Sequence, residues 1–286
     1  MTFTTLSPWD VRGILELAVA AESLGLSSVW VGDTLLRPVV EPLTVLSAVA
    51  AVTRRIGLGT ATLLPLLRRP VQTASVLASV DRLSGGRLTV GVGAGFPGRS
   101  EREYAISEVP WERRFVRLDE TVGVWRQLWA GEPVVIGSIE VPPVVPPARE
   151  GGPAVWLGGA GRSALGRAGR LYDGWLPYPP TVSAYASGLA AVRAGGREIA
   201  PALFATVLVG DDEGLDAYVR AAYGMPRSVV STIQLLVAGP AEHVRSVLDA
   251  YVAAGARHLV LRIAALDLAT QREQLALIAG LYGPAV

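Results

Sequence analysis

The 286-residue chain contains no cysteine, no lysine and no asparagine. The absence of cysteine excludes disulfides, thiolate metal ligands and a thiol nucleophile. The absence of lysine excludes a Schiff base with a carbonyl substrate, and all 26 basic residues are arginines. Imidazole chemistry is limited to His243 and His258. Neither has a second histidine near it in the sequence, so we expect no metal site.

Strong charge and long apolar runs are also lacking. The formal charge is +1, which gives no support for binding nucleic acid. No run reaches the roughly 18–20 apolar residues that cross a bilayer, so we expect no membrane partner. The first residues, MTFTTLSPWDVR, lack the basic and then apolar pattern of a signal peptide. These observations predict a cytoplasmic protein that acts on small molecules.

Short apolar strands alternate with helical stretches along the whole chain. We predict strands at residues 3–6, 28–31, 56–60, 88–92, 155–157, 173–176, 202–209 and 258–263. We predict helices at residues 9–24, 42–54, 70–83, 112–130, 162–170, 182–193 and 241–254, and at 270–281. This alternation is typical of an α/β protein with a parallel sheet.

Eight strands in fewer than 300 residues predict a (β/α)8 TIM barrel, with an open doubly wound sheet as the alternative. Short insertions are expected after strand 4, where residues 132–153 are rich in proline and valine, and after strand 7, where residues 211–223 and 227–236 indicate extra helices. The composition shows no break and no long linker. We therefore expect one domain over residues 1–286.

Residues 81–95, DRLSGGRLTVGVGAG, divide into two parts. Gly85 and Gly86 lie where a helix would end in a left-handed residue, so the first part is expected to build the fold. Gly93 and Gly95 leave the strand on the side where TIM barrels place their active sites. Glycines there would let a flat ring or a phosphate approach the backbone. The second part is therefore a candidate binding segment.

A second glycine-rich loop, at residues 158–163, lies between a predicted strand and a predicted helix. Free amides at a helix N-terminus attract anions, and glycines let the anion come close. A tight turn that binds nothing is the alternative. The loop consists of Gly158, Gly159, Ala160, Gly161, Arg162 and Ser163.

Several motifs occur in a characteristic order: Asp33 after SVWV, RRIGLGTATL at residues 54–63, Arg69-Pro70, DRLSGGRLTVGVGAG, LDE and LW at the two ends of residues 118–129, and AVWLGGAGRSALGRAGRLYDGW at residues 154–175. In this order the chain resembles the bacterial luciferase-like superfamily of flavin and coenzyme F-420-dependent oxidoreductases. The resemblance covers residues 18–175, and residues 238–262 are similar to the last barrel unit of that family. The arginine-only composition suggests a GC-rich genome and favours an actinobacterial F-420 user over an FMN luciferase.

The resemblance implies a site for the cofactor. The loop at residues 158–163 would hold its phosphate, and a non-prolyl cis peptide between Ala61 and Thr62 would form a bulge behind the flavin ring. Asp33 would contact the cofactor or only cap the segment that follows it. Gly93, Gly95 and Phe96 would complete the ring site.

Two positions depart from the family pattern. Thr34 stands where many members have a catalytic histidine, and a threonine hydroxyl cannot act as a base at neutral pH. Phe96 stands where the F-420 sugar-phosphate dehydrogenases have a glutamate. Both departures argue against alcohol oxidation, and the catalytic residues stay unassigned.

Three functions remain open. The first is an F-420-dependent oxidoreductase that transfers hydride to or from a small, fairly apolar organic substrate, with reduction favoured. The second is an FMN-dependent luciferase-type monooxygenase, and the third is a barrel that binds flavin without catalysis. An arginine group near strand exits (Arg37, Arg68, Arg69 and Arg99) is a candidate for an acidic cofactor tail or a carboxylate, although each alone could be a surface residue. The resemblance also implies a homodimer.

Overall fold

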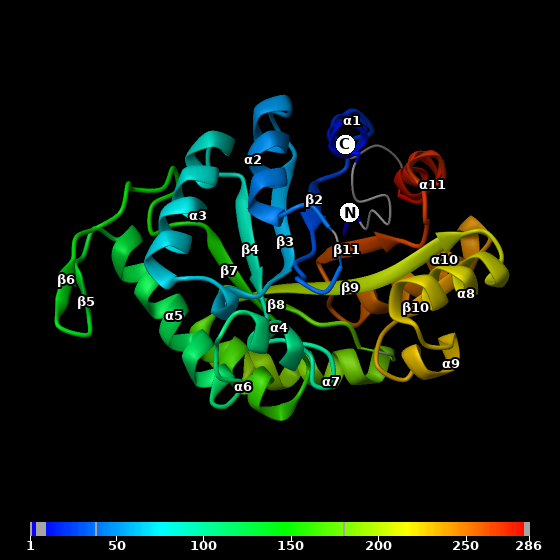
Figure 1. Ribbon diagram of the computed structural model, residues 1–286. Coiled ribbons are helices and arrows are strands. Elements are labelled where there is room, and N and C mark those ends of the chain that lie inside the picture. Colours follow the sequence, from blue (N-terminus) through cyan, green and yellow to red (C-terminus); the bar gives the residue numbers. More distant parts are fainter. Residues whose placement is uncertain (1, 4–9, 38, 180, 283–286) are drawn as a thin grey trace.

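The computed structural model describes residues 2–3, 10–37, 39–179 and 181–282. Within these residues, nine strands form one parallel sheet in the order β10-β9-β11-β1-β2-β3-β4-β7-β8 (Figure 1). The strands are β1 (Thr2–Phe3), β2 (Ser28–Val31), β3 (Gly57–Leu63), β4 (Leu88–Val92), β7 (Ala154–Gly158), β8 (Gly174–Leu176), β9 (Ala200–Val209), β10 (Leu236–Gly239) and β11 (His258–Ile263).

The long strand β9 connects the two ends of this order. Its first residues, Ala200 and Pro201, pair with β8. Residues 202–207 pair with β11, and residues 206–209 pair with β10. The pairing of β8 with β9 therefore joins eight strands in a ring, and β10 extends the sheet beside the far end of β9.

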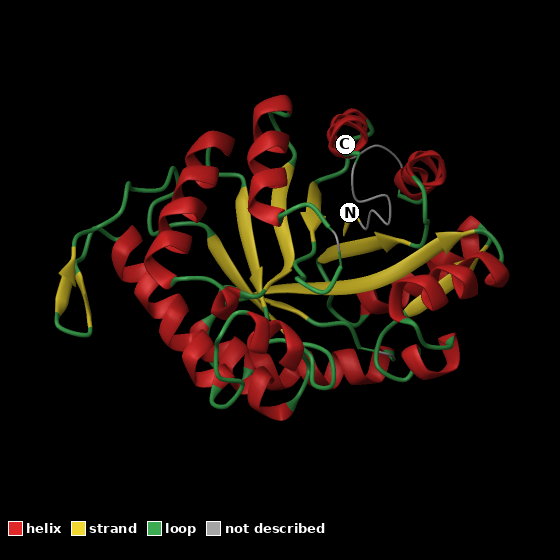
Figure 2. Ribbon diagram, in the orientation of Figure 1, coloured by secondary structure: helices red, strands yellow, loops and turns green. Residues whose placement is uncertain are grey.

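Helices surround the strands, as Figure 2 shows, because parallel neighbours need a crossover connection that covers the sheet. They are α1 (Val11–Ser23), α2 (Pro42–Val52), α3 (Pro70–Ser84), α4 (Glu101–Ile106), α5 (Arg114–Trp129), α6 (Arg162–Leu171), α7 (Val182–Arg193), α8 (Asp212–Tyr223), α9 (Arg227–Val230), α10 (Ala241–Ala253) and α11 (Leu268–Gly280), with a short 3-10 helix at Pro65–Leu67. A hairpin of β5 (Val134–Ile136) and β6 (Ile139–Val141) projects from the body near α5. In the described part of the chain, no helix is both long enough and apolar enough to span a bilayer.

The predicted α/β class and parallel sheet are confirmed, and three details were wrong or missed. The third strand was predicted to end at Thr60 but continues to Leu63 through a change of register against β4. Residues 227–236 were predicted as part of a helical insertion, but only one helical turn forms, and β10 begins at Leu236. The short helix α4 was not predicted. The predicted first strand, residues 3–6, lies outside the described residues beyond Phe3.

Alternation along the strands divides the core in two. In β2, Trp30 points into the ring of strands, whereas its neighbour Val29 packs under the surrounding helices. In β9, Phe204 lies inside the ring and Leu203 outside it. The residues that fill the interior are Trp30, Ala61, Trp156, Leu176, Ala202, Phe204 and Val260.

The first part of the segment 81–95 builds the fold, as predicted. Gly85 ends α3 in the left-handed conformation. The guanidinium of Arg87 then donates to the backbone carbonyls of Ile56, Ala50 and Thr53, which lie at and after the end of α2. These bonds satisfy carbonyls that a helix end leaves without intrahelical partners. This part of the segment therefore anchors α2 and α3 at the N-terminal end of β4.

His258 lies at the first residue of β11, between two indoles of the interior. Its ring centroid is 5.5 Å from that of Trp30 and 5.1 Å from that of Trp156. Its Nε2 is 3.1 Å from the hydroxyl of Ser28. Burial lowers the pKa of His258 to about 4. The histidine therefore belongs to the core of the fold, as its position at the start of a strand indicated.

This burial predicts a dependence of stability on pH. The unfolded chain binds the proton near pH 6.5, whereas the folded chain resists it until about pH 4. The contribution of neutral His258 to the free energy of unfolding is therefore fully present above pH 6.5 and is lost as the pH falls toward 4. We expect a loss of about 2 kcal/mol between pH 7 and pH 5. Urea unfolding of the wild type and of His258→Gln at both pH values measures it, and an equal loss in both proteins would contradict the assignment.

Candidate active site

The carboxyl ends of β3, β4 and β7 meet at Thr62. The peptide bond between Ala61 and Thr62 is cis, as predicted. A Cβ at Gly93 would lie 2.7 Å from the hydroxyl oxygen of Thr62, and a Cβ at Gly158 would lie 3.0 Å from its methyl group. These two glycines therefore make room for Thr62, and their contact with a ligand stays a prediction. Thr62 is half-buried.

Gly95 and Phe96 form the turn that follows β4. Gly95 has a φ of +81°, and a Cβ there would lie 2.6 Å from that of Ser100. The hydroxyl of Ser100 accepts a hydrogen bond from the Phe96 amide at 3.0 Å. The Phe96 side chain is 41% exposed. The turn thus presents an aromatic ring at the carboxyl end of the sheet.

Asp33, after β2, has a carboxylate that is 2% exposed and engaged within the chain. It accepts hydrogen bonds from the Leu64 amide at 2.9 Å and from both terminal nitrogens of Arg68. Arg68 also reaches Glu41 at 2.9 Å. Asp33 therefore joins the exits of β2 and β3, whereas the sequence predicted a contact with the cofactor or a cap on the segment after Asp33.

Thr34 binds a carboxylate that sequence reasoning missed. Its hydroxyl donates to Oε1 of Glu103 at 2.7 Å, and the Leu35 amide donates to the same oxygen at 2.9 Å. Glu103 is 3% exposed and belongs to α4. Both hydrogen bonds fix the loop after β2 against the segment after β4. Nothing in the sequence around Glu103 indicated this contact, because it depends on how two loops pack.

We expect Glu103→Ala to lower the free energy of unfolding by about 1–3 kcal/mol, because it leaves two donors of the loop without their acceptor. Glu103→Gln keeps a side-chain oxygen at the same place and should retain most of that stability. Denaturant unfolding of the two variants and the wild type measures the difference. Equal losses in both variants would show that the acceptor oxygen is not what stabilises the loop.

The loop 158–163 leads from β7 into α6. Gly159 has a φ of +107°, and its carbonyl accepts a hydrogen bond from the indole of Trp175 at 2.8 Å. The first hydrogen bond of the helix joins the Leu165 amide to the Gly161 carbonyl. The amides of residues 162–164 therefore have no acceptor within the helix.

This helix end is accessible. Ala160, Gly161, Arg162 and Ser163 are exposed, and in the described residues no side chain caps α6. Free amides on an exposed helix end form a site for an anion. The structure thus has the local form that the phosphate prediction requires.

The structure places the four arginines considered from the sequence in different surroundings. Arg68 belongs to the Asp33 ion pair, and Arg69 is exposed at the start of α3. Arg37 donates to the Ala222 carbonyl at 3.1 Å, and Arg99 lies 5.9 Å from the centroid of the Tyr223 ring. Two of the four therefore gather at the end of α8.

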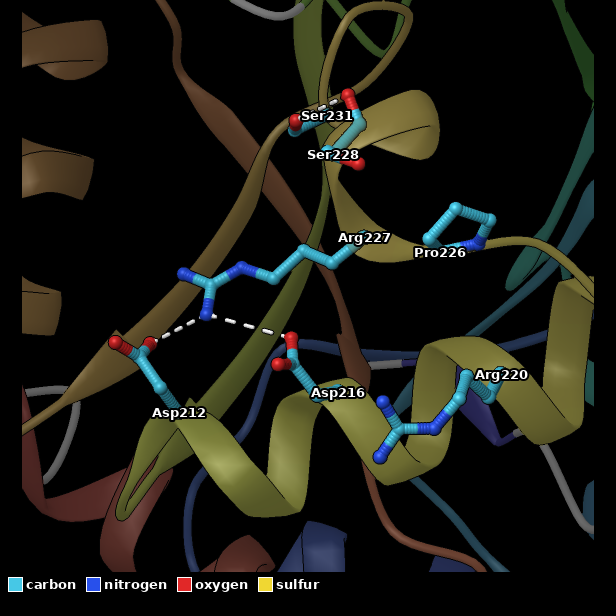
Figure 3. A pocket seen from close by; sticks show the side chains of 7 residues that line it. All are labelled: Asp212, Asp216, Arg220, Pro226, Arg227, Ser228 and Ser231. Atoms are coloured by element: carbon cyan, nitrogen blue, oxygen red, sulfur yellow. Dashed lines mark hydrogen bonds and ion pairs between the residues drawn. The ribbon is translucent and has the colours of Figure 1, made fainter.

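Figure 3 shows a pocket between α8 and α9 that contains none of the predicted site residues. In it Arg227 pairs with Asp212 and, at 3.6 Å, with Asp216. These charges satisfy one another and hold α9 against α8. The lining residues are Asp212, Asp216, Arg220, Pro226, Arg227, Ser228 and Ser231. Nor does the described part of the chain bring together acidic or histidine side chains that could hold a metal ion.

Comparison with known proteins places this fold and site in a family. Residues 3–231 match the model of the luciferase-like monooxygenases. The chain therefore belongs to the luciferase-like monooxygenase family, as the order of its motifs indicated.

Individual relatives agree with this placement. The chain is 38% identical over 133 residues to the F420-dependent glucose-6-phosphate dehydrogenase of Amycolatopsis mediterranei (strain U-32), a match that covers 43% of this chain and 39% of the relative. Such matches span about two fifths to just over half of the curated relatives' length. Among solved structures, an F420-dependent secondary alcohol dehydrogenase in complex with an F420-acetone adduct has a TM-score of 0.80 at 18% identity, covering 96% of both chains. The monooxygenase RslO1 from Streptomyces bottropensis has a TM-score of 0.76 at 23% identity, covering 98% of this chain and 97% of its own. Both structures share the fold.

Proposed function

We propose that the chain is an oxidoreductase that uses coenzyme F-420 to transfer hydride to or from a small, fairly apolar organic substrate, with reduction favoured. One observation carries the proposal. The exposed glycine-built start of α6, at the carboxyl end of β7, offers free amides to a phosphate in a chain of the luciferase-like family. The 38% identity to an F420-dependent dehydrogenase favours the deazaflavin cofactor as the ligand that carries this phosphate.

The residues at the carboxyl ends of the strands fit such a cofactor. The amides at Arg162 and Ser163 suit a phosphate. The half-buried Thr62, joined to Ala61 by the cis peptide, suits the ring. Reduced F-420 supplies a hydride from C5, while the protein orients it and shapes the pocket. The residues proposed to bind it are Asp33, Ala61, Thr62, Gly93, Gly95, Phe96, Gly158, Gly159, Ala160, Gly161, Arg162 and Ser163. Asp33 would act indirectly, by holding the loops after β2 and β3 together.

The direction of the reaction follows from the groups near Thr34. An alcohol substrate loses a proton as it is oxidised, so it needs a base, and a threonine that already donates to Glu103 cannot supply one. Phe96 adds no charge at the neighbouring turn. Reduction of an enone or an imine is therefore favoured over oxidation of an alcohol. The exposed side chains of Leu35 and Phe96 suit the apolar part of such a substrate.

The family also supports a second function, an FMN-dependent monooxygenase, because its model is described by that activity. Reaction with oxygen distinguishes the two. The protein is mixed with reduced F-420 or with reduced FMN in air-saturated buffer, and oxygen consumption is followed with an electrode. We expect reduced F-420 to persist and to be consumed only when an enone or imine is added. Rapid oxygen consumption on FMN would replace the proposal, and binding of F-420 without turnover of any substrate would indicate a non-catalytic flavin-binding barrel.

Further aspects of the organisation are proposed with this function. We propose that residues 1–286 fold as one TIM-barrel domain, in which the segments after β4 and β9 are short insertions. We propose also that the chain forms a homodimer and works in the cytoplasm. Size-exclusion chromatography with light scattering tests the homodimer.

A further inference from the structure

Tyr223, the last residue of α8, has a phenol oxygen fixed by two donors from other elements. Arg262 donates to it from β11 at 2.6 Å, and Gln234 donates from the segment before β10 at 2.8 Å. Arg262 shares the face of β11 with Val260, which fills the interior of the ring. Its guanidinium lies 4.7 Å from the centroid of Phe204, another interior residue. The phenol oxygen therefore lies at the end of the strand ring where β9 and β11 finish, next to the residues that fill the interior of the ring.

The charge around this phenol is positive. Arg37 and Arg99 lie beside it on the loops after β2 and β4, and Arg262 faces it from β11. Among the described residues, none of these three arginines forms an ion pair with a carboxylate. The other titratable neighbours are tyrosines: Tyr218, on the same helix, which interacts with Arg262, and Tyr178, after β8.

The guanidinium of Arg262 is held within the chain. It donates to the phenol oxygen of Tyr223, and its charge and a hydrogen bond also couple it to Tyr218, the other tyrosine of α8. Arg262 and Gln234 both donate to the phenol oxygen, so the O–H of Tyr223 can itself donate, with the Thr206 hydroxyl beside it as one acceptor within the chain.

We propose that Tyr223 is the proton donor of the reaction, acting on the substrate atom that receives the electron pair. The proposal rests on the function proposed above, and it supplies the acid that Thr34 cannot. The reduced deazaflavin, when bound, would supply a hydride to the electrophilic carbon of an enone or imine, and the π electrons would move to the carbonyl oxygen or the imine nitrogen. That atom takes the proton of Tyr223, and the phenolate that remains is held by Arg262 and Gln234 until solvent returns a proton.

The surroundings favour this role. Burial alone would raise the pKa of Tyr223, but the charge of Arg262, together with hydrogen bonds that include the one from Gln234, lowers its pKa below the ordinary tyrosine value. A phenol with a lowered pKa gives up its proton more readily at neutral pH. Tyr282, by contrast, has a pKa raised to about 12, first by burial and then by its hydrogen bond to Asp249.

The first test is an ultraviolet titration of tyrosine ionisation in the cofactor-free protein. We expect one tyrosine to ionise before the others, and Tyr223→Phe to remove that step. Arg262→Gln should move the step to higher pH. Tyr282→Phe is the matched control, because it removes one tyrosine hydroxyl just after the end of α11 and should leave the early step in place. An early ionisation that persists in Tyr223→Phe would overturn the proposal.

The second test measures turnover and cofactor binding together. With reduced F-420 and cyclohexenone or a cyclic imine, Tyr223→Phe should lose about 100-fold in kcat, the lower range for loss of an acid, with an unchanged Kd for F-420. Arg262→Gln, which keeps the phenol, should lose less and should shift the basic limb of the pH profile upward. A Tyr223→Phe variant that binds F-420 and retains wild-type kcat would overturn the proposal. A wild type that binds no F-420 would instead overturn the proposed function, and the ionisation titration would then still test the lowered pKa of Tyr223.

Discussion

Ser163→Asp is expected to weaken binding of either cofactor about 100-fold, because it places a carboxylate where the phosphate would bind. Ser163 is the second residue of α6 and is exposed at its uncapped start. A like charge within about 5 Å of a phosphate costs on the order of 3 kcal/mol near a protein surface, which corresponds to about two powers of ten in Kd. The same acidic side chain stabilises a helix N-terminus by about 0.3–1 kcal/mol. The loss of binding therefore cannot come from unfolding of the helix.

Fluorescence titration with F-420 and with FMN measures this effect. Ala241→Asp provides the control, because it adds the same charge to the first turn of α10, away from the loop 158–163. It should leave both dissociation constants within about twofold of the wild type, and both variants should unfold at the wild-type denaturant concentration or above it. Equal affinity of Ser163→Asp and the wild type for the cofactor would contradict binding of its phosphate at the start of α6.

Asp33→Ala is expected to lower the free energy of unfolding by about 3–5 kcal/mol, the range for breaking a buried ion pair by removing one partner. The carboxylate is 2% exposed and holds the Leu64 amide together with Arg68. Its removal leaves a buried amide and a largely buried guanidinium without their acceptor, although Arg68 keeps Glu41. The exits of β2 and β3 would then separate.

Chemical denaturation compares Asp33→Ala with Glu41→Ala. Glu41 is the other partner of Arg68, but its side chain is 45% exposed, so its loss should cost less than about 1 kcal/mol. The ratio between the two losses tests the assignment of Asp33 as a structural residue. Similar small losses in both variants would mean that Asp33 contributes little to folding and would return it to the role of a cofactor contact.

Much of the fold could be predicted because it depends on local patterns. The strand SVWV, the proline at the start of α3 and the glycine at its end each determine their neighbours through backbone geometry. The sequence patterns gave wrong predictions where tertiary packing determined the local structure. In β3 the bulge carries the strand past Thr60, and at residues 227–236 a single helical turn gives way to a strand that pairs with the end of β9.

At the site, too, local features could be predicted from the sequence, whereas contacts that depend on packing could not. The loop 158–163 could be located because a strand, a glycine run and a helix start follow one another in the sequence. The contact of Thr34 with Glu103 joins residues 69 positions apart, and that of Tyr223 with Arg262 joins residues 39 positions apart. No periodicity encodes such pairs. Gly93, after β4, and Gly158, in β7, were identified from the sequence as candidate site residues. The side chain that their missing Cβ atoms accommodate, that of Thr62, became visible only in the structure.

We propose that this barrel binds a deazaflavin, and equilibrium binding of the wild-type protein is the decisive measurement. Purified protein is titrated with F-420 and, separately, with FMN, and the change in cofactor fluorescence gives the two dissociation constants. The account predicts saturable binding of F-420 with a Kd at least about tenfold below that for FMN, a difference of about 1.4 kcal/mol. Tighter binding of FMN, or no binding of F-420, would contradict it.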